Sequence, residues 1–181
     1  MKILLLVVAG IVSIIAVVSA LFVADQWKQA DEYNQWLTLT EDAESVMESF
    51  NLADVGYWNQ NVETTIQKKS AWAKTGKLAY QGAVDLSLLV EDMNDVRLLP
   101  WHSNLEQARQ DYIAHTEAWI TEYEKKYEFS QSVQGLESWS YSRDTIDIST
   151  TFAVAERSAK KALPIIFAGD LEQRVQSEFL D

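Results

Sequence analysis

Residues 3–24 read ILLLVVAGIVSIIAVVSALFVA, a run in which no side chain is charged and only Ser13 and Ser19 are polar. A helix of this length measures about 33 Å, which exceeds the roughly 30 Å hydrocarbon core of a bilayer. The run therefore predicts a transmembrane signal anchor over residues 1–24, followed by a separate domain over residues 25–181.

A cleaved signal peptide is the alternative interpretation of the same residues. Lys2 would supply its basic start, and Val18-Ser19-Ala20 would supply a small-residue cleavage site. The anchor is favoured because the run is longer than the roughly 7–15 residues of a signal-peptide core and continues through Phe22. No second apolar run of this length follows, so we expect a single-pass membrane protein.

Small residues recur every three or four positions along one side of this segment. The set consists of Gly10, Ser13, Ala16 and Ala20. Transmembrane helices associate through close packing at such positions, so the set is a candidate membrane-packing face. Small residues scattered through an ordinary apolar helix would give the same pattern.

Aromatic residues follow the apolar run. The candidates for a membrane interface are Trp27, Tyr33 and Trp36. Trp and Tyr are enriched where a membrane helix leaves the bilayer, so we expect these three side chains at the level of the lipid headgroups.

Charge predicts the orientation of the chain. Lys2 before the span and Lys28 after it nearly balance, and the free α-amino group tips the positive-inside rule toward a cytoplasmic N-terminus. The whole chain has a net charge of −12, and Lys2 is the only charged side chain before residue 25, so the remainder carries −13. An anionic cytoplasmic leaflet would repel such a domain. We therefore expect the C-terminal domain on the extracytoplasmic side of the cell membrane.

Composition excludes several classes of protein. The chain has no cysteine, which rules out disulfides, thiolate nucleophiles and Cys-ligated metals. Its acidic balance argues against nucleic-acid binding, which needs a basic surface. Six Gly and two Pro are too few for a β-sandwich rich in tight turns. The expected partners are the lipid bilayer and other membrane protein subunits, and no nucleic acid.

Apolar spacing of three to four residues predicts an all-α, up-and-down helical bundle after the span. The expected helices cover about residues 25–50, 59–96, 103–135, 144–163 and a short stretch from 169 onward. A restart is predicted at Thr38, which has capping-box spacing with Glu41, and a turn is predicted at residues 51–58 around Gly56.

Five further residues refine these helices. Ser103 and Glu106 form the strongest capping-box pattern in the chain, and Asp144 is a candidate cap for the next helix. Gly76 and Gly82 lie inside the expected helix 59–96, where each costs about 1 kcal/mol relative to Ala. They predict either a kink or a place where another helix comes close.

Candidate catalytic and metal-binding groups are few. His102 follows Pro100 and Trp101, and His115 stands four residues after Asp111, which places these two on one helix face. No Glu-x-x-His or His-x-x-x-His spacing occurs, so the usual pattern of helical metal ligands is missing. We therefore expect no catalytic residue, no cofactor and no metal site, and we interpret Asp111 with His115 as a structural pair.

Three classes of function stay open. The one that fits best is a non-enzymatic accessory subunit of a larger membrane complex, for which a respiratory or other energy-transducing assembly is one natural host. The second is an extracytoplasmic ligand-binding sensor that acts through a membrane partner. Its layout resembles the helical sensor domains of chemoreceptors in joining an N-terminal anchor to a bundle, but a second transmembrane helix and a signalling domain are missing. The third is a hydrolase, which only the two histidines support.

Overall fold

A computed structural model describes residues 2–59, 62–136, 140–141, 148–166 and 169–180. These residues contain five α-helices and no strand, which confirms the predicted all-α class. The helices are α1 (Lys2–Trp58), α2 (Thr65–Asp95), α3 (Ser103–Ser132), α4 (Ile148–Ala162) and α5 (Gly169–Leu180), and a short 3-10 helix η1 (Val133–Gly135) follows α3. The cap predicted at Asp144 lies outside the described residues.

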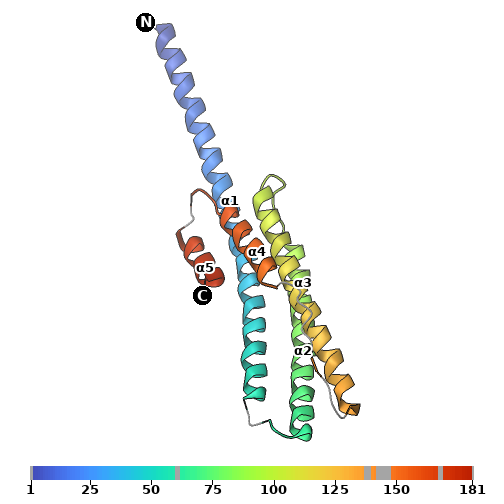
Figure 1. The fold of residues 1–181 in the computed structure, drawn as a ribbon. Coiled ribbons are helices and arrows are strands. Elements are labelled where there is room, and N and C mark those ends of the chain that lie inside the picture. Colours follow the sequence, from blue (N-terminus) through green and yellow to red (C-terminus); the bar gives the residue numbers. More distant parts are fainter. Residues whose placement is uncertain (1, 60–61, 137–139, 142–147, 167–168, 181) are drawn as a thin grey trace.

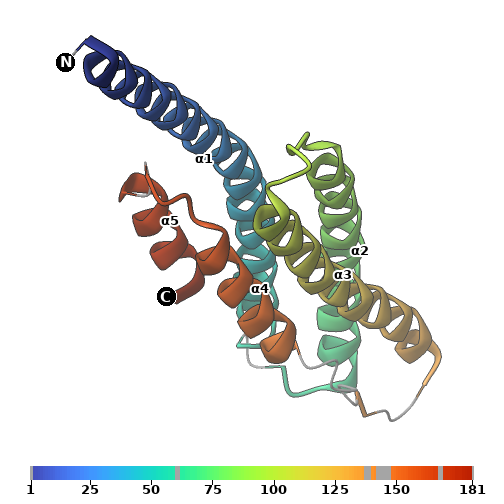
Figure 2. The same cartoon turned by 90° about the horizontal axis from the view of Figure 1, so that it is seen from above.

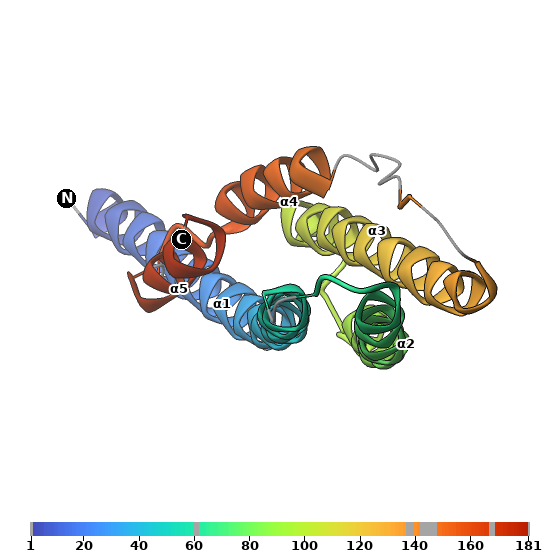
Figure 3. The same ribbon diagram turned by 60° about the horizontal axis from the view of Figure 1, so that its bottom comes forward.

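The N-terminal part of α1 projects alone from one end of a helical bundle (Figure 1). The rest of α1 packs beside α2, and α3 contacts α1, α2 and α4. α5 packs against α1 and α4, away from α2 (Figure 3). The α2–α3 and α4–α5 connections both lie at the end of the bundle from which α1 projects (Figure 1), and Figure 2 shows the same arrangement from above.

Among the described residues, α1 is the one helix that is long and apolar enough to cross a membrane. Its residues 10–24 are all exposed, because no other described part of the chain packs against them. Length and composition make this projecting part a candidate span, although a signal sequence near an N-terminus meets the same criterion.

α1 continues through both points at which the sequence predicted an interruption, so those two predictions are wrong. Oγ1 of Thr38 donates to the carbonyl oxygen of Asn34 at 3.1 Å, and the hydroxyl thus bonds within the helix instead of capping a new one. Near the C-terminal end, the Trp58 ring packs against Trp72 of α2 with centroids 5.2 Å apart. The last residue of α1 is thus packed against α2.

Helix starts differ in part from the predictions, since α2 begins at Thr65 instead of near residue 59. α2 begins with a capping box in which Gln67 N donates to Thr64 Oγ1 at 3.2 Å and Thr64 N donates to Gln67 Oε1 at 2.9 Å. α3 begins at Ser103, near the predicted start, but His102 occupies its N-cap position and makes no side-chain cap bond. The predicted capping box at Ser103 is therefore wrong.

Gly76 and Gly82 allow α3 to approach α2 closely, which confirms one of the two predicted alternatives. A Cβ atom at Gly76 would overlap the side chain of Ser130. A Cβ atom at Gly82 would lie 2.8 Å from Cε2 of Tyr123. Both contacts would be shorter than a normal contact between two carbon atoms. The absence of a side chain at Gly76 and at Gly82 therefore permits the close spacing of α2 and α3.

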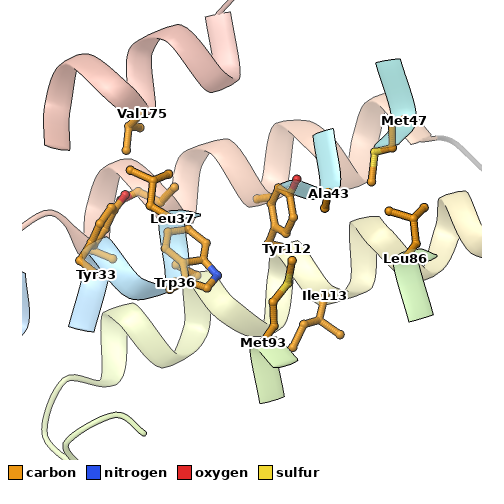
Figure 4. Close-up of a cluster of buried hydrophobic side chains, with 14 of the residues drawn as sticks. Tyr33, Trp36, Leu37, Ala43, Met47, Leu86, Met93, Tyr112, Ile113 and Val175 are labelled. Carbon is orange, nitrogen blue, oxygen red and sulfur yellow. The ribbon is translucent and has the colours of Figure 1, made fainter. Parts of the chain in front are cut away.

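The core gathers buried side chains from all five helices, and Figure 4 shows its central part. Trp36 packs edge-on against Tyr33 and Tyr112, with ring centroids 5.2 and 6.2 Å away. Tyr33 and Trp36, which were predicted at the membrane interface, are fully buried inside the bundle. The physical reason is that α3 and α4 cover α1 within a few turns of its apolar run.

A charged pair joins α5 to α1. Nε and Nη2 of Arg174 donate to the two carboxylate oxygens of Glu41 at 2.7 and 2.6 Å. Such a two-point contact fixes direction as well as distance. It complements the burial of Leu171 and Val175, which join the core from α5.

Candidate functional site

Besides Glu41, which binds Arg174 of α5, and Asp25, which accepts from Trp101, α1 presents three further carboxylates to the rest of the bundle. The residues are Glu32, Glu44 and Asp54, which stand twelve and ten residues apart, or about three helical turns. Each carboxylate meets polar groups from other elements. We call these the three inner polar contacts, and they contain both histidines of the chain.

The first inner polar contact joins Glu32 to the α2–α3 connection. Nδ1 of His102 donates to Oε2 of Glu32 at 2.7 Å, and the N–H of Leu99 donates to the same oxygen at 3.2 Å. The side chains of Glu32 and His102 are almost fully buried. Nε2 of His102 lies 3.4 Å from Oδ1 of Asp25, so the imidazole bridges two carboxylates of α1.

The second inner polar contact surrounds Glu44. The Tyr112 hydroxyl lies 2.8 Å from Oε1 of Glu44 and 3.1 Å from the carbonyl oxygen of Thr40. Nε2 of His115 is 3.8 Å from the same Glu44 oxygen. Nδ1 of His115 donates to Oγ1 of Thr151 at 2.9 Å, since that hydroxyl already donates to a backbone carbonyl of α4.

Burial changes the proton affinity of both groups in the second contact. Desolvation raises the pKa of Glu44 above its ordinary value, and the hydrogen bond from Tyr112 opposes this rise. Desolvation also lowers the pKa of His115 from 6.5 to about 4. His115 is therefore neutral at physiological pH, and no ion pair with Glu44 forms there.

The third inner polar contact ties α1 to α2 and α3. Oγ1 of Thr75 donates to Oδ1 of Asp54 at 2.7 Å, and Nζ of Lys126 donates to Oδ2 at 3.3 Å. Nε1 of Trp58 donates to Oδ1 at 3.2 Å. The Lys126 ammonium also lies 4.7 Å from the centroid of the Phe50 ring, which favours its charge.

The predicted pair of Asp111 and His115 is not formed. Asp111 accepts hydrogen bonds from Ser158 Oγ and Gln107 Nε2, whereas His115 turns toward Glu44 and α4. Residues of α4 thus supply a separate partner to each group. Within the described residues, no group of three or more His, Asp or Glu side chains is arranged to hold a metal ion.

The predicted membrane-packing face lies in the projecting part of α1. Its members, Gly10, Ser13, Ala16 and Ala20, are all exposed. A Cβ atom added at Gly10 would meet no atom within 4 Å. No described part of the chain covers this face, so it is open to another helix or to lipid.

Trp27 differs from the other two predicted interface residues. Its side chain is 61% exposed and lies three residues beyond the apolar run. Trp27 therefore remains a candidate for contact with lipid headgroups, whereas the buried rings of Tyr33 and Trp36 cannot reach them.

A surface cavity of about 490 Å³ lies between α2 and α3, and the sequence analysis missed it. Its apolar lining comes mainly from Tyr80, Ala83, Val84, Leu88 and Tyr127, and Glu124 and Glu128 complete its α3 side. Tyr80, Val84 and Leu88 follow one another at intervals of four residues, which defines a stripe on one side of a helix. That spacing could have indicated the cavity from the sequence. It is difficult to distinguish there from the neighbouring stripe of α2 that faces the core.

Comparisons of this chain with protein-family models, curated proteins and solved structures find no match. The argument for a function therefore depends on the geometry described above.

Proposed function

We propose that this chain is a non-enzymatic accessory subunit of a larger membrane protein complex. In this proposal α1 anchors it in the cell membrane with a cytoplasmic N-terminus, and the acidic bundle lies on the extracytoplasmic side. The observation that carries the proposal is that α1 is a single helix of 57 residues, which joins the candidate span to the core of the bundle. A partner that holds one part of α1 thereby positions the other.

Buried hydrogen bonds keep the bundle part of α1 from rotating independently. The hydroxyl of Tyr33 donates to the carbonyl oxygen of Ala159 in α4 at 2.9 Å. Together with the inner polar contacts at Glu32, Glu44 and Asp54, it joins α1 to α2, α3 and α4. Both histidines of the chain take part in these contacts, which supports a structural role for them over a catalytic one.

Two surfaces suit docking to other subunits. In lipid, helices associate by close packing, and the exposed face from Gly10 to Ala20 allows a partner helix to come near. Outside the lipid, the cavity between α2 and α3 exposes an apolar surface beside two carboxylates, Glu124 and Glu128. The charge of −13 on residues 25–181 would steer such a domain toward a basic partner.

The test is native electrophoresis of the full chain extracted from its membrane in mild detergent. We expect it to migrate in an assembly that contains other subunits, and the double variant Gly10→Leu, Ser13→Leu to be released from that assembly. Ile15→Leu with Val18→Leu is the matched control, since these residues lie on the opposite side of α1 at 100° per residue.

Two results would contradict the proposal. One is that the wild-type chain migrates alone under all conditions. The other is that two differently tagged copies account for the whole assembly, which would make it a homo-oligomer. Release at raised salt would add that charge contributes to the contact, because exposed charges are screened beyond about 8 Å at physiological ionic strength.

A ligand-binding sensor is the second candidate, and the cavity between α2 and α3 favours it. Its volume of about 490 Å³ falls within the range of small-molecule sites, about 300–1,000 Å³. In this case the neutral dye Nile red should bind the full chain and lose affinity in Val84→Trp, which fills the cavity. Unchanged dye binding in Val84→Trp would remove the support for a sensor without affecting the subunit proposal.

A further inference from the structure

Exposed apolar side chains from three separate parts of the chain gather at the end from which α1 projects. They are Trp27 of α1, Trp101 of the α2–α3 connection and Ile165 of the α4–α5 connection, which are 61%, 64% and 82% exposed. We propose that these three residues, the membrane-proximal face, insert into the headgroup layer of the bilayer that α1 crosses. The bundle then rests directly on the lipid surface.

Trp101 is held at the level where the apolar run ends. Its Nε1 donates to Oδ1 of Asp25 at 2.7 Å, and Asp25 is the first charged residue after residues 3–24. The next residue, His102, points inward and is bonded to Glu32. The indole therefore stays beside Asp25 as long as the first inner polar contact is intact.

Ile165 is held one residue farther along α1. Its N–H donates to Oε1 of Gln26 at 2.7 Å, and Nε2 of Gln29 donates to the carbonyl oxygen of Ala162 at 3.0 Å. These bonds join the start of the α4–α5 connection to the turn of α1 that follows Asp25. Two connections that are far apart in sequence thus meet the same short stretch of the anchor helix.

The depth of these residues matches the headgroup layer. Trp27 lies three residues beyond Ala24, or about 4.5 Å along α1, and the headgroup layer adds about 5–7 Å on each side of the hydrocarbon core. Indole rings are favoured at this level because their body is apolar and their N–H keeps a polar partner. Asp25 is that partner for Trp101.

The charge of the bundle indicates which kind of lipid contact to expect. A domain with a charge of −13 is repelled by anionic lipids, so the contact depends on apolar insertion and should form on neutral phosphatidylcholine. It should also be insensitive to salt, unlike docking through exposed charges.

Ile66 provides a matched control at the other end of the bundle. It is 81% exposed, nearly the same as Ile165, but it lies in the first turn of α2, next along the chain to the C-terminal end of α1. Residues 25–58 of α1 separate that end from the candidate span by about 50 Å. The two isoleucines therefore have nearly the same exposure and differ in their distance from the candidate span.

The test uses single-cysteine variants of the full chain, which has no cysteine of its own. Ile165→Cys, Ser103→Cys, Ile66→Cys and Ile15→Cys each receive a polarity-sensitive fluorophore, and the chain is reconstituted in phosphatidylcholine vesicles. The vesicles carry shallow nitroxide lipids for the labels at 165, 103 and 66, and nitroxides deep in the acyl chain for the label at 15. Ser103 is exposed and lies two residues after Trp101, so it reports on the same connection without removing the indole. Circular dichroism confirms that each variant keeps the helical fold.

We expect nitroxide lipids to quench the labels at residues 165 and 103 several-fold more than the label at residue 66, at low and high salt alike. Equal quenching at 165, 103 and 66 would overturn the inference. A signal at 165 that depends on protein concentration and not on nitroxide would overturn it too, because a second copy would then cover this face. The inference rests on the proposed membrane anchoring, which the label at residue 15 tests separately. If that label is not quenched, α1 is not inserted and both proposals fail, whereas quenching at 15 alone rejects only the membrane-proximal face.

Discussion

Glu32 and His102 are 70 residues apart in the chain, yet Oε2 of Glu32 accepts a hydrogen bond from Nδ1 of His102 at 2.7 Å. The contact attaches the α2–α3 connection to α1 seven residues after Asp25, the first charged residue beyond the apolar run. It therefore fixes the position of this connection relative to α1.

Glu32→Leu should destabilise the bundle. The change leaves the Nδ1–H of His102 and the N–H of Leu99 buried without their acceptor, and each such loss costs about 1–3 kcal/mol. Urea denaturation of the full chain in detergent, followed by circular dichroism, measures the free energy of unfolding. Glu91→Leu, at an exposed position of α2, is the control and should change it by less than about 0.5 kcal/mol. Equal effects of the two substitutions would contradict the structural role of Glu32.

Gly76→Ala should destabilise the contact between α2 and α3. The new Cβ atom would overlap Ser130, and overpacking of this kind costs about 1–3 kcal/mol. Gly56→Ala is the matched control, because Gly56 is helical with no atom within 4 Å of the added Cβ, and it should gain up to about 1 kcal/mol. Ser130→Gly should restore part of the loss in Gly76→Ala. The close approach would be refuted if both alanine variants were stabilised.

Tyr33→Phe should weaken the attachment of α4 to α1. The change removes the hydroxyl that donates to the carbonyl oxygen of Ala159, and a typical hydrogen bond contributes about 0.5–1.5 kcal/mol to stability. The same measurement on Tyr80→Phe provides the control, because Tyr80 is 55% exposed and lies at the surface cavity. A loss in Tyr80→Phe as large as in Tyr33→Phe would be inconsistent with this assignment.

Acid should destabilise the fold through His115. Its pKa is about 4 in the folded protein and 6.5 when exposed, so between these pH values the unfolded state binds a proton that the folded state does not. This group leaves stability unchanged above pH 6.5 and lowers it as the pH falls toward 4. The shift corresponds to a change in unfolding free energy of roughly 3 kcal/mol. In His115→Gln the unfolding free energy should depend less on pH over this range.

Glu44 faces His115 and acts in the opposite direction. Because burial raises the pKa of Glu44, the folded state takes up its proton before the unfolded state does as the pH falls, which adds stability. Glu44→Gln should therefore make the acid-induced loss steeper than in the wild type. Identical pH profiles for the wild type, His115→Gln and Glu44→Gln would show that neither group titrates as proposed.

Several features of this protein were predictable from local sequence. The uncharged run at residues 3–24 identifies the candidate span, because length and apolarity depend on no other part of the chain. Apolar residues at intervals of three to four positions predict the helices. The glycines at 76 and 82 predict either a kink or a close approach, and the structure shows the close approach. The membrane-packing face, the orientation and the docking function remain predictions.

Other features depended on contacts between residues that are far apart in the sequence. Helical spacing placed His115 on the same side as Asp111, but α4 and Glu44 supply its actual contacts. Tyr33 and Trp36 looked like interface residues because they follow the span, yet they are buried because α3 and α4 return to cover α1. α1 continues to Trp58, and the ring of Trp58 packs against Trp72 of α2. Local periodicity determines which side chains share a face of a helix. Packing between elements far apart in the chain determines what that face contacts, and therefore how deeply its side chains are buried and how far their pKa values shift.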